Sequence, residues 1–278
     1  CTFILTTLKK ILDNLIYLDK FEDLDKNMSD SNIGARKGRN VKDHLFLIYG
    51  IINSVVNGSE PSIDIQIYDL EKAFDALWLD DCMIDAYNTL PSGARDDKLA
   101  VLYESNAENL VAVNTAVGLT ERVNIPKIVQ QGGTWGPCLC SNSVDTLGKK
   151  IRDRGEATYL YKKTVRVLPL AMVDDINAIS ECGLDSVNLN TFINSQMELK
   201  KLRFHVPDMD GKSKCHKMHV GRKKEMCPEL RVHGTVMETV TEDMYLGDLI
   251  SSDGKNKKNV EKRISKGLGI ITQVINLL

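Results

Sequence analysis

Three aspartates stand where they could hold metal ions. Asp69 follows an alternating stretch over 62–68 that predicts a strand, and Asp174-Asp175 separates two short apolar runs. Two adjacent ionised carboxylates in a tight turn repel each other, and a bound cation relieves that repulsion. Magnesium prefers hard oxygen ligands and takes one or two carboxylates together with phosphate oxygens and water. The pattern allows a magnesium site, although an Asp-Asp turn is more often a plain polar hairpin.

The chemistry of such a site would be phosphoryl transfer. Two magnesium ions about 4 Å apart can activate a hydroxyl group and stabilise the leaving oxygen of an in-line displacement. This reaction needs little from the protein beyond positioning and charge stabilisation. Manganese is a possible substitute for magnesium.

The elements that must position these aspartates follow from hydrophobic periodicity. Apolar residues at helical spacing predict helices over 7–20, from Val41 to Val55, after Pro137, and from Val260 to Ile275. Strand patterns lie over 62–68, 165–168, 170–173 and 176–179, and residues 23–39 predict a loop. This mixture indicates an α+β fold.

Composition indicates an ordinary globular chain. Of 278 residues, 42% are apolar and 27% are charged, and no apolar run is long enough to cross a bilayer. We therefore expect no membrane partner. The sequence does not decide the localisation and leaves the nucleus and the cytoplasm open. The formal charge of −2 does not favour nucleic-acid binding, but basic residues gather in 36–39, 149–154, 162–166 and 212–224. Such patches either hold phosphates or form solvated surface.

The seven cysteines do not form a disulfide pattern, because their number is odd and their spacing does not repeat. Reduced thiols are the expected state. One cluster, Cys215, His216, His219 and Cys227, could hold zinc, but its spacing does not match a common zinc finger.

Six segments, in order along the chain, resemble one family of polymerases. They are 31–40, 68–75, 131–137, 171–176, 212–221, and 245–247 followed by 251–254. The first resembles a fingers motif, and the next four resemble palm motifs A, B, C and D. The last resembles the primer-grip region. Together they make the chain similar, over nearly its whole length, to the reverse transcriptases of non-LTR (LINE-type) retrotransposons.

The resemblance implies an RNA-directed DNA polymerase that adds deoxynucleotides (dNTPs) to a DNA primer on an RNA template. It implies the α+β fingers and palm of a reverse transcriptase, with a small antiparallel palm sheet packed on helices and the thumb largely absent. We expect partial fingers over 1–60, a palm with interleaved fingers elements over 61–250, and a helix leading toward a missing thumb over 251–278. We also expect the chain to be a fragment of a longer product.

The resemblance also assigns roles to residues. Asp69 and Asp174 would hold both metal ions, Asp175 would assist, and the backbone carbonyl of Leu70 would complete the coordination. The nucleotide-binding candidates are Arg36, Arg39, Phe74, Gln131, Gly132 and Lys214.

Each of these candidates has a physical rationale. Guanidinium groups pair with phosphate oxygens in a bidentate manner, which suits Arg36 and Arg39 to a triphosphate, unless they are simply loop charges. Phe74 would block a 2′-hydroxyl or would pack in the core. Lys214 would neutralise, or donate a proton to, the departing pyrophosphate. Gln131 and Gly132 suit a turn that the nucleic-acid backbone approaches closely.

Three alternatives remain open. The chain could be an inactive or domesticated remnant that only binds nucleic acid, a metal-binding interaction domain built around Cys215 and Cys227, or a different two-metal phosphotransferase. The retained aspartates favour the polymerase. The last alternative does not explain the segments that resemble motifs B and D.

Overall fold

The computed structural model describes residues 7–107, 110–124, 134–155, 158–206, 213–221, 227–255 and 257–277. Its centre is a five-stranded sheet with the strand order β13-β10-β1-β9-β8. The strands are β1 (Ile63–Asp69), β8 (Leu170–Met172), β9 (Asp175–Glu181), β10 (His216–Val220) and β13 (Glu238–Val240). Neighbouring strands are antiparallel except β10 and β13. The predicted α+β class, with a small sheet packed on helices, is confirmed.

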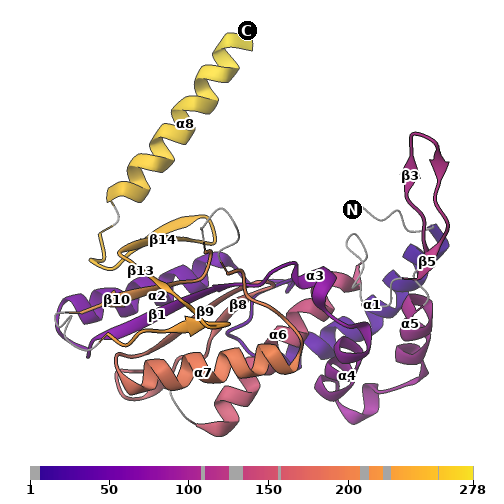
Figure 1. Cartoon of the computed structure of the whole chain (residues 1–278), viewed down its shortest axis with the longest axis horizontal. Helices are drawn as coiled ribbons and strands as arrows, with labels where there is room; N and C mark the ends of the chain where they lie inside the picture. The colour runs from indigo at the N-terminus through magenta and orange to yellow at the C-terminus, as the bar shows by residue number, and fades with distance from the viewer. Residues whose placement is uncertain are drawn as a thin grey trace.

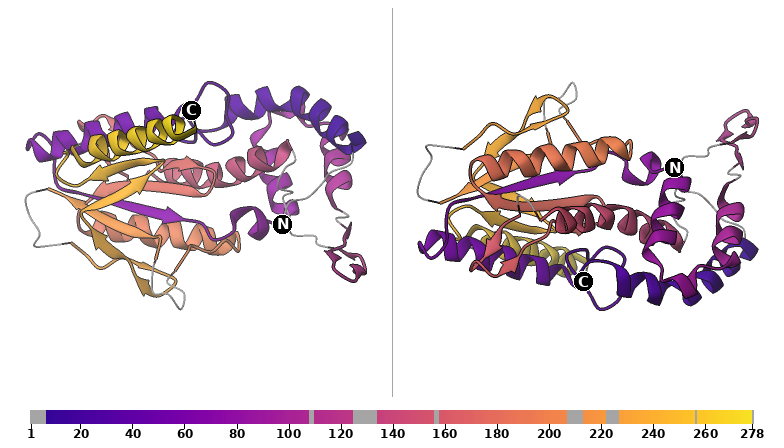
Figure 2. Two further views of the ribbon diagram at one scale, coloured as in Figure 1. Left: turned by 90° about the horizontal axis from the view of Figure 1, so that it is seen from above. Right: turned by 90° about the horizontal axis from the view of Figure 1, so that it is seen from below.

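The sheet lies between helix α2 (Val41–Val56) on one face and helix α7 (Leu184–Leu199) on the other, as Figure 2 shows. Side chains alternate between the faces of a strand. Ile63, Ile65 and Ile67 of β1 therefore share one core cluster with the apolar face of α2. The opposite face of β1 is polar but also buried, since α7 covers it. There the Gln66 side-chain amide donates to the Ser186 carbonyl of α7 at 2.9 Å.

Helix α2 begins where its sequence provides a cap. The Asn40 side chain accepts from the Lys42 N–H at 3.0 Å, and the Asp43 carboxylate accepts from the Asn40 N–H at 3.2 Å. This reciprocal pair satisfies two backbone donors that the first turn would otherwise leave free. The predicted helix from Val41 to Val55 is confirmed within a residue.

The other end of the molecule is helical (Figure 1). It contains α1 (Thr7–Asn27), α3 (Ala73–Ala76), α4 (Leu79–Thr89), a 3₁₀ turn (Ser92–Ala94), α5 (Asp97–Ala107) and α6 (Trp135–Arg154). Residues along most of α6 are buried, so this helix joins the helical end to the sheet. Helix α1 continues to Asn27, past the predicted end at residue 20, and the predicted loop is correspondingly shorter.

Short hairpins and a last helix complete the described chain. The hairpins are β2 (Leu110–Val111) with β5 (Val123–Asn124), β3 (Asn114–Thr115) with β4 (Gly118–Leu119), β6 (Leu160–Tyr161) with β7 (Val165–Arg166), β11 (Arg231–Val232) with β12 (Thr235–Val236), and β14 (Glu242–Tyr245) with β15 (Asp248–Ser251). Helix α8 (Lys257–Leu277) projects from the body (Figure 1), and its apolar Val260, Ile264 and Ile271 are exposed. The proposed domain boundaries stay predictions.

The described helices include none that is both long and apolar enough to cross a membrane.

The segment before α2 is fastened to the edge of the sheet. The Ala171 N–H of β8 donates to the Ser31 carbonyl at 2.9 Å, and the Ile33 N–H donates to the Ala171 carbonyl at 3.0 Å. The chain then passes so close to the β8–β9 turn that a Cβ on Gly34 would lie 2.6 Å from the Val173 nitrogen. Only glycine therefore allows this approach.

Substitution of this glycine is expected to destabilise the protein. Gly34→Ala should lower the free energy of unfolding by about 1–3 kcal/mol, because the added methyl meets backbone atoms that cannot move aside easily. Gly50→Ala in α2 is the matched control, since a Cβ there meets nothing within 4 Å. That change should raise stability by about 0.5–1 kcal/mol. Urea denaturation measures both, and equal effects would contradict the close approach at Gly34.

Candidate active site

The register of the sheet brings the three predicted aspartates together. Asp69, the last residue of β1, pairs directly with Asp175, the first residue of β9. Asp174 precedes Asp175 in the β8–β9 turn, and its carbonyl accepts from the Leu70 N–H at 3.1 Å. The end of one strand and the turn beside it thus lie at the same edge of the sheet.

The turn that carries Asp174 is tight and strained. Met172 pairs with Asp175, which leaves Val173 and Asp174 as the two residues of the loop. Val173 has a φ of 59°, in the left-handed region that β-branched residues rarely adopt. Strain of this kind persists only where the surrounding structure holds it, here the pairing of β8 and β9 and the contact with Gly34.

The electrostatics of this group favour a cation. Burial raises the pKa of Asp175 to about 6, and the carboxylates of Asp174 and Asp69 contribute to that rise, while Lys214 opposes it. The carboxyl group is therefore held where its negative charge is costly. A divalent ion bound by hard oxygen atoms would remove that cost, so the donor set fits magnesium.

Lys214 lies at the same place. Its ammonium nitrogen is 3.3 Å from Oδ2 of Asp69, and its side chain is 61% exposed. A cavity of about 200 Å³ adjoins this pair and is also lined by Asp175. Among the predicted nucleotide-binding residues, the structure thus places Lys214 beside the carboxylates; its role stays a prediction.

The cavity contains an ion pair that sequence reasoning missed. Nδ1 of His216 lies 2.6 Å from Oδ2 of Asp243, and both residues line the cavity with Asp69 and Asp175. The hydrogen bond to Asp243 raises the pKa of His216. No sequence signal joins His216 to Asp243, because the contact depends on how the segment after β13 returns to the sheet.

The two predicted arginines are each bound by an aspartate. The Arg36 side chain is only 2% exposed; it is bound to the Asp25 carboxylate and donates to the backbone carbonyls of Ser29 and Asn32. Arg39 pairs with Asp30. In this structure Arg36 supports the loop after α1; contact of Arg36 or Arg39 with a triphosphate stays a prediction.

The structure leaves the predicted roles of the other candidates, Phe74, Leu70, Gln131 and Gly132, untested. Phe74 is half-buried and packs against the core, which accords with its packing interpretation without testing its contact with a sugar. Leu70 is fixed beside Asp174 by its N–H, and coordination by its carbonyl stays a prediction. Gln131 and Gly132 lie outside the described residues.

The zinc cluster suggested by the sequence does not form. Cys215 approaches the Asp69 backbone carbonyl, with its Sγ at 3.8 Å, and His216 binds Asp243. His219 lies instead beside Asp64, and Cys227 beside Cys182. The hypothesis of four converging ligands among Cys215, His216, His219 and Cys227 is therefore wrong. Neighbours along β10 point to opposite faces of the sheet, which separates them.

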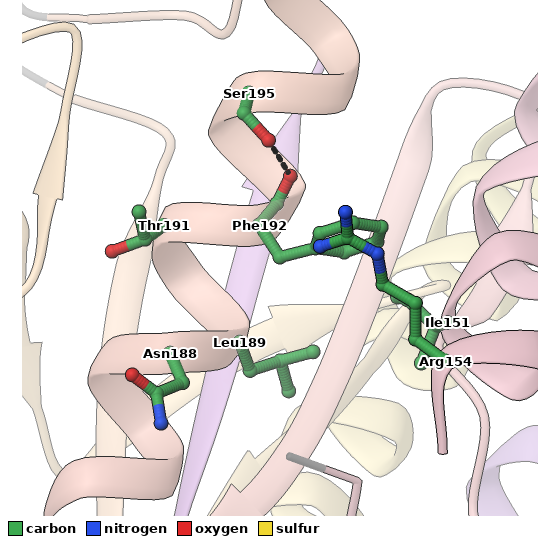
Figure 3. Close-up of a pocket in the computed structure, with 7 residues that line it drawn as sticks. All are labelled: Ile151, Arg154, Asn188, Leu189, Thr191, Phe192 and Ser195. Atoms are coloured by element: carbon green, nitrogen blue, oxygen red, sulfur yellow. Dashed lines mark hydrogen bonds between the residues drawn. The ribbon is translucent and has the colours of Figure 1, made fainter. Parts of the chain in front are cut away.

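A second cavity, of about 330 Å³, lies between α6 and α7 (Figure 3). The Arg154 guanidinium stacks over the Phe192 ring at 4.7 Å, and the Ser195 hydroxyl donates to the Phe192 carbonyl at 2.8 Å. The described residues of its lining include no carboxylate, imidazole or thiol. The carboxylate group at Asp69 is therefore the stronger candidate for catalysis.

The sheet with its covering helices is a reverse-transcriptase-like α+β fold, and comparison with solved structures supports that fold class. One similar structure is apo telomerase from Candida tropicalis, with a TM-score of 0.56 and 13% identity over 88% of this chain. Another is telomerase from Candida tropicalis in complex with a TWJ fragment of telomeric RNA, with a TM-score of 0.56 and 15% identity over 90% of this chain. A third is telomerase from Candida albicans in complex with a TWJ fragment of telomeric RNA, with a TM-score of 0.52 and 13% identity over 87% of this chain.

The likeness has definite bounds. The chain spans 37–40% of the length of these three telomerase chains. At this low identity the likeness shows the fold and not the activity. No protein-family model and no curated protein matches the chain. The non-LTR origin implied by the motifs is a finer assignment than this shared fold.

Neutralising Asp175 should stabilise the metal-free protein. The folded-state pKa of this group lies above its ordinary 3.8. Its ionisation therefore lowers the stability of the fold as pH rises from 3.8 to about 6, and the whole loss of stability is present above pH 6. Asp175→Asn should therefore raise Tm in EDTA at pH 7.5, by about 2–4 °C for each kcal/mol of relieved cost, and much less at pH 4.

The control is Asp153→Asn, because this carboxylate is exposed on α6 and should change stability by less than about 0.5 kcal/mol. Magnesium or manganese should raise the Tm of the wild-type chain and of Asp153→Asn, but raise that of Asp175→Asn less. Calorimetry with and without EDTA measures these shifts. A lower Tm for Asp175→Asn at pH 7.5 in EDTA would contradict the repulsion described above.

Proposed function

We propose that this chain is the fingers-and-palm part of an RNA-directed DNA polymerase of the non-LTR retrotransposon type. The observation that carries the proposal is the convergence of Asp69, Asp174 and Asp175 at one edge of the sheet, with Lys214 beside them. The shared fold supports it, and so do the six ordered segments of the sequence.

The carboxylates would hold two magnesium ions, for which manganese is a possible substitute. Magnesium, when bound, supplies charge stabilisation and an activated hydroxyl for phosphoryl transfer. Asp69 and Asp174 would be the main ligands, Asp175 would assist, and the Leu70 carbonyl would complete the set. The Lys214 ammonium would release Asp69 and neutralise the departing pyrophosphate; its exposed side chain leaves room for that movement.

The proposed partners are an RNA template, a DNA primer and dNTPs. Two of the similar telomerase structures are described as complexes with a fragment of telomeric RNA, which makes RNA a reasonable ligand for the same fold. The basic residues over 149–154 and 162–166 could contact phosphates, since local patches act even where net charge is near zero.

Deoxynucleotide incorporation on primed poly(rA) with magnesium tests the proposal. The wild-type chain should extend the primer, and Asp174→Ala Asp175→Ala should reduce the rate at least about 10³-fold, because several kcal/mol of charge stabilisation are lost. Lys214→Ala should reduce the rate less, and Lys255→Ala is its control, because that exposed lysine pairs with nearby Asp253 and not with the carboxylates.

Negative outcomes of this assay distinguish an inactive remnant from a module that only binds nucleic acid. If the wild type and a longer chain that includes the thumb are both inert, this copy is a remnant that keeps the fold. Binding of primer-template without extension would then favour the nucleic-acid-binding alternative. Equal rates for the wild type and the double variant would remove the carboxylates from the reaction.

Phe74 offers a separate test of sugar selection. If its ring faces the sugar, Phe74→Val should raise ribonucleotide incorporation relative to deoxynucleotide incorporation by about 10–200-fold, the range that one hydrophobic contact commands. Leu77→Val is the control for loss of core volume in the same segment, since Leu77 is buried. The ratio of kcat/KM values for the two nucleotides is the measurement. An unchanged ratio in Phe74→Val would leave Phe74 with packing alone.

A further inference from the structure

A second group of metal-ligating side chains lies at the other end of β1. It consists of Asp64, Cys182, His219 and Cys227, whose ligand atoms all lie within 4.8 Å of one another. Asp64 is near the start of β1 and Asp69 at its end, so at about 3.3 Å per residue the two groups are roughly 17 Å apart. This four-donor cluster is therefore separate from the candidate active site.

The sheet fixes three of the four donors. Asp64 on β1 pairs directly with His219 on β10, and Oδ1 of Asp64 lies 2.9 Å from Nδ1 of His219. Cys182 directly follows β9, and its N–H donates to the Ser62 carbonyl at 3.0 Å. Cys227 completes the group from a different part of the chain. Hydrogen-bonded strands thus hold the donors in place before any ligand binds.

The spacing of the donors suits a tetrahedral ion. Two sulfur atoms that each lie about 2.3 Å from a tetrahedral zinc ion are separated by about 3.8 Å. The Sγ atoms of Cys182 and Cys227 are 3.9 Å apart. A disulfide would require about 2.05 Å, so both residues are present as thiols.

The cluster is an unfavourable place for its own side chains. Asp64 is fully buried, and its Oδ2 and the Nε2 of His219 have no hydrogen-bond partner among the described residues. A buried polar group without a partner destabilises the fold, because it has given up its hydrogen bonds to water. A cation at this point would remove these penalties together.

We propose that Asp64, Cys182, His219 and Cys227 form a structural zinc site. Two thiolates and an imidazole favour zinc over the hard cations that suit the carboxylates at Asp69. Four protein donors leave no open coordination position, so the site is structural and not catalytic. Zinc would join the ends of β1, β9 and β10 to the segment that begins at Cys227.

Metal analysis of the whole chain tests this site. Protein supplied with zinc under reducing conditions and then desalted should retain about one zinc ion per chain. Cobalt(II) in its place should give the thiolate charge-transfer and intense d–d absorption of a tetrahedral site. Cys182→Ser and Cys227→Ser should each weaken zinc binding more than about 100-fold, since even changes outside the ligand shell cost about 10–100-fold.

Two further variants show whether the zinc is bound by these four side chains. Cys215→Ser removes a buried thiol just before β10 and should retain zinc, whereas Cys227→His should keep most of the binding because it supplies another donor. A wild-type chain without zinc and without the cobalt spectrum would overturn the proposal. So would equal zinc loss in Cys215→Ser and Cys227→Ser, or a Cys182–Cys227 disulfide under reducing conditions. The cobalt titration uses the wild-type chain, so it does not depend on how the variants fold.

Discussion

The antiparallel pairing of β1 with β9 is the constraint on which both candidate metal sites depend. At one end it sets Asp69 against Asp175, and at the other it brings Cys182 beside the start of β1 through the bond to Ser62. A slip of one residue would turn every side chain to the opposite face. The buried isoleucines of β1 oppose such a slip, because it would place them in the polar network on the α7 face. The apolar core therefore determines where the carboxylates lie.

The polar face of β1 shows why a buried strand can look exposed in a sequence. Asp64, Gln66 and Tyr68 alternate with isoleucines, a pattern usual for a strand with one face in water. Here that face is buried by α7, and Gln66 and Tyr68 find partners there: Tyr68 donates to Gln66 at 2.6 Å, and Asn190 donates to Tyr68 at 2.8 Å. Such a network fixes the position of α7 on the sheet, because leaving any member unpaired would be costly.

Local pattern was enough to predict the strands around the aspartates, helix α2 and the α+β class. What it could not supply was long-range register. Cys182 and Asp64 meet only because β9 lies beside β1. Sequence spacing therefore grouped His219 and Cys227 with Cys215 and His216, which are not their neighbours in the fold. The ion pair of Arg36 was not predicted for a related reason. Helix α1 continues to Asn27 and brings Asp25 to the Arg36 guanidinium. The polar residues over 23–39 have no helical periodicity, so the sequence did not predict this last part of α1.

The short stretch from Lys214 through β10 links the two ends of the sheet. Lys214, just before this strand, lies beside Asp69, and His219, near its end, lies beside Asp64. Because β10 is paired to β1 along its length, holding His219 also holds the strand that positions Lys214. A zinc ion at the four-donor cluster would therefore stabilise the geometry at the carboxylates without contacting them. Its loss should first loosen the pairing of β10 with β1, and only through that pairing disturb the lysine.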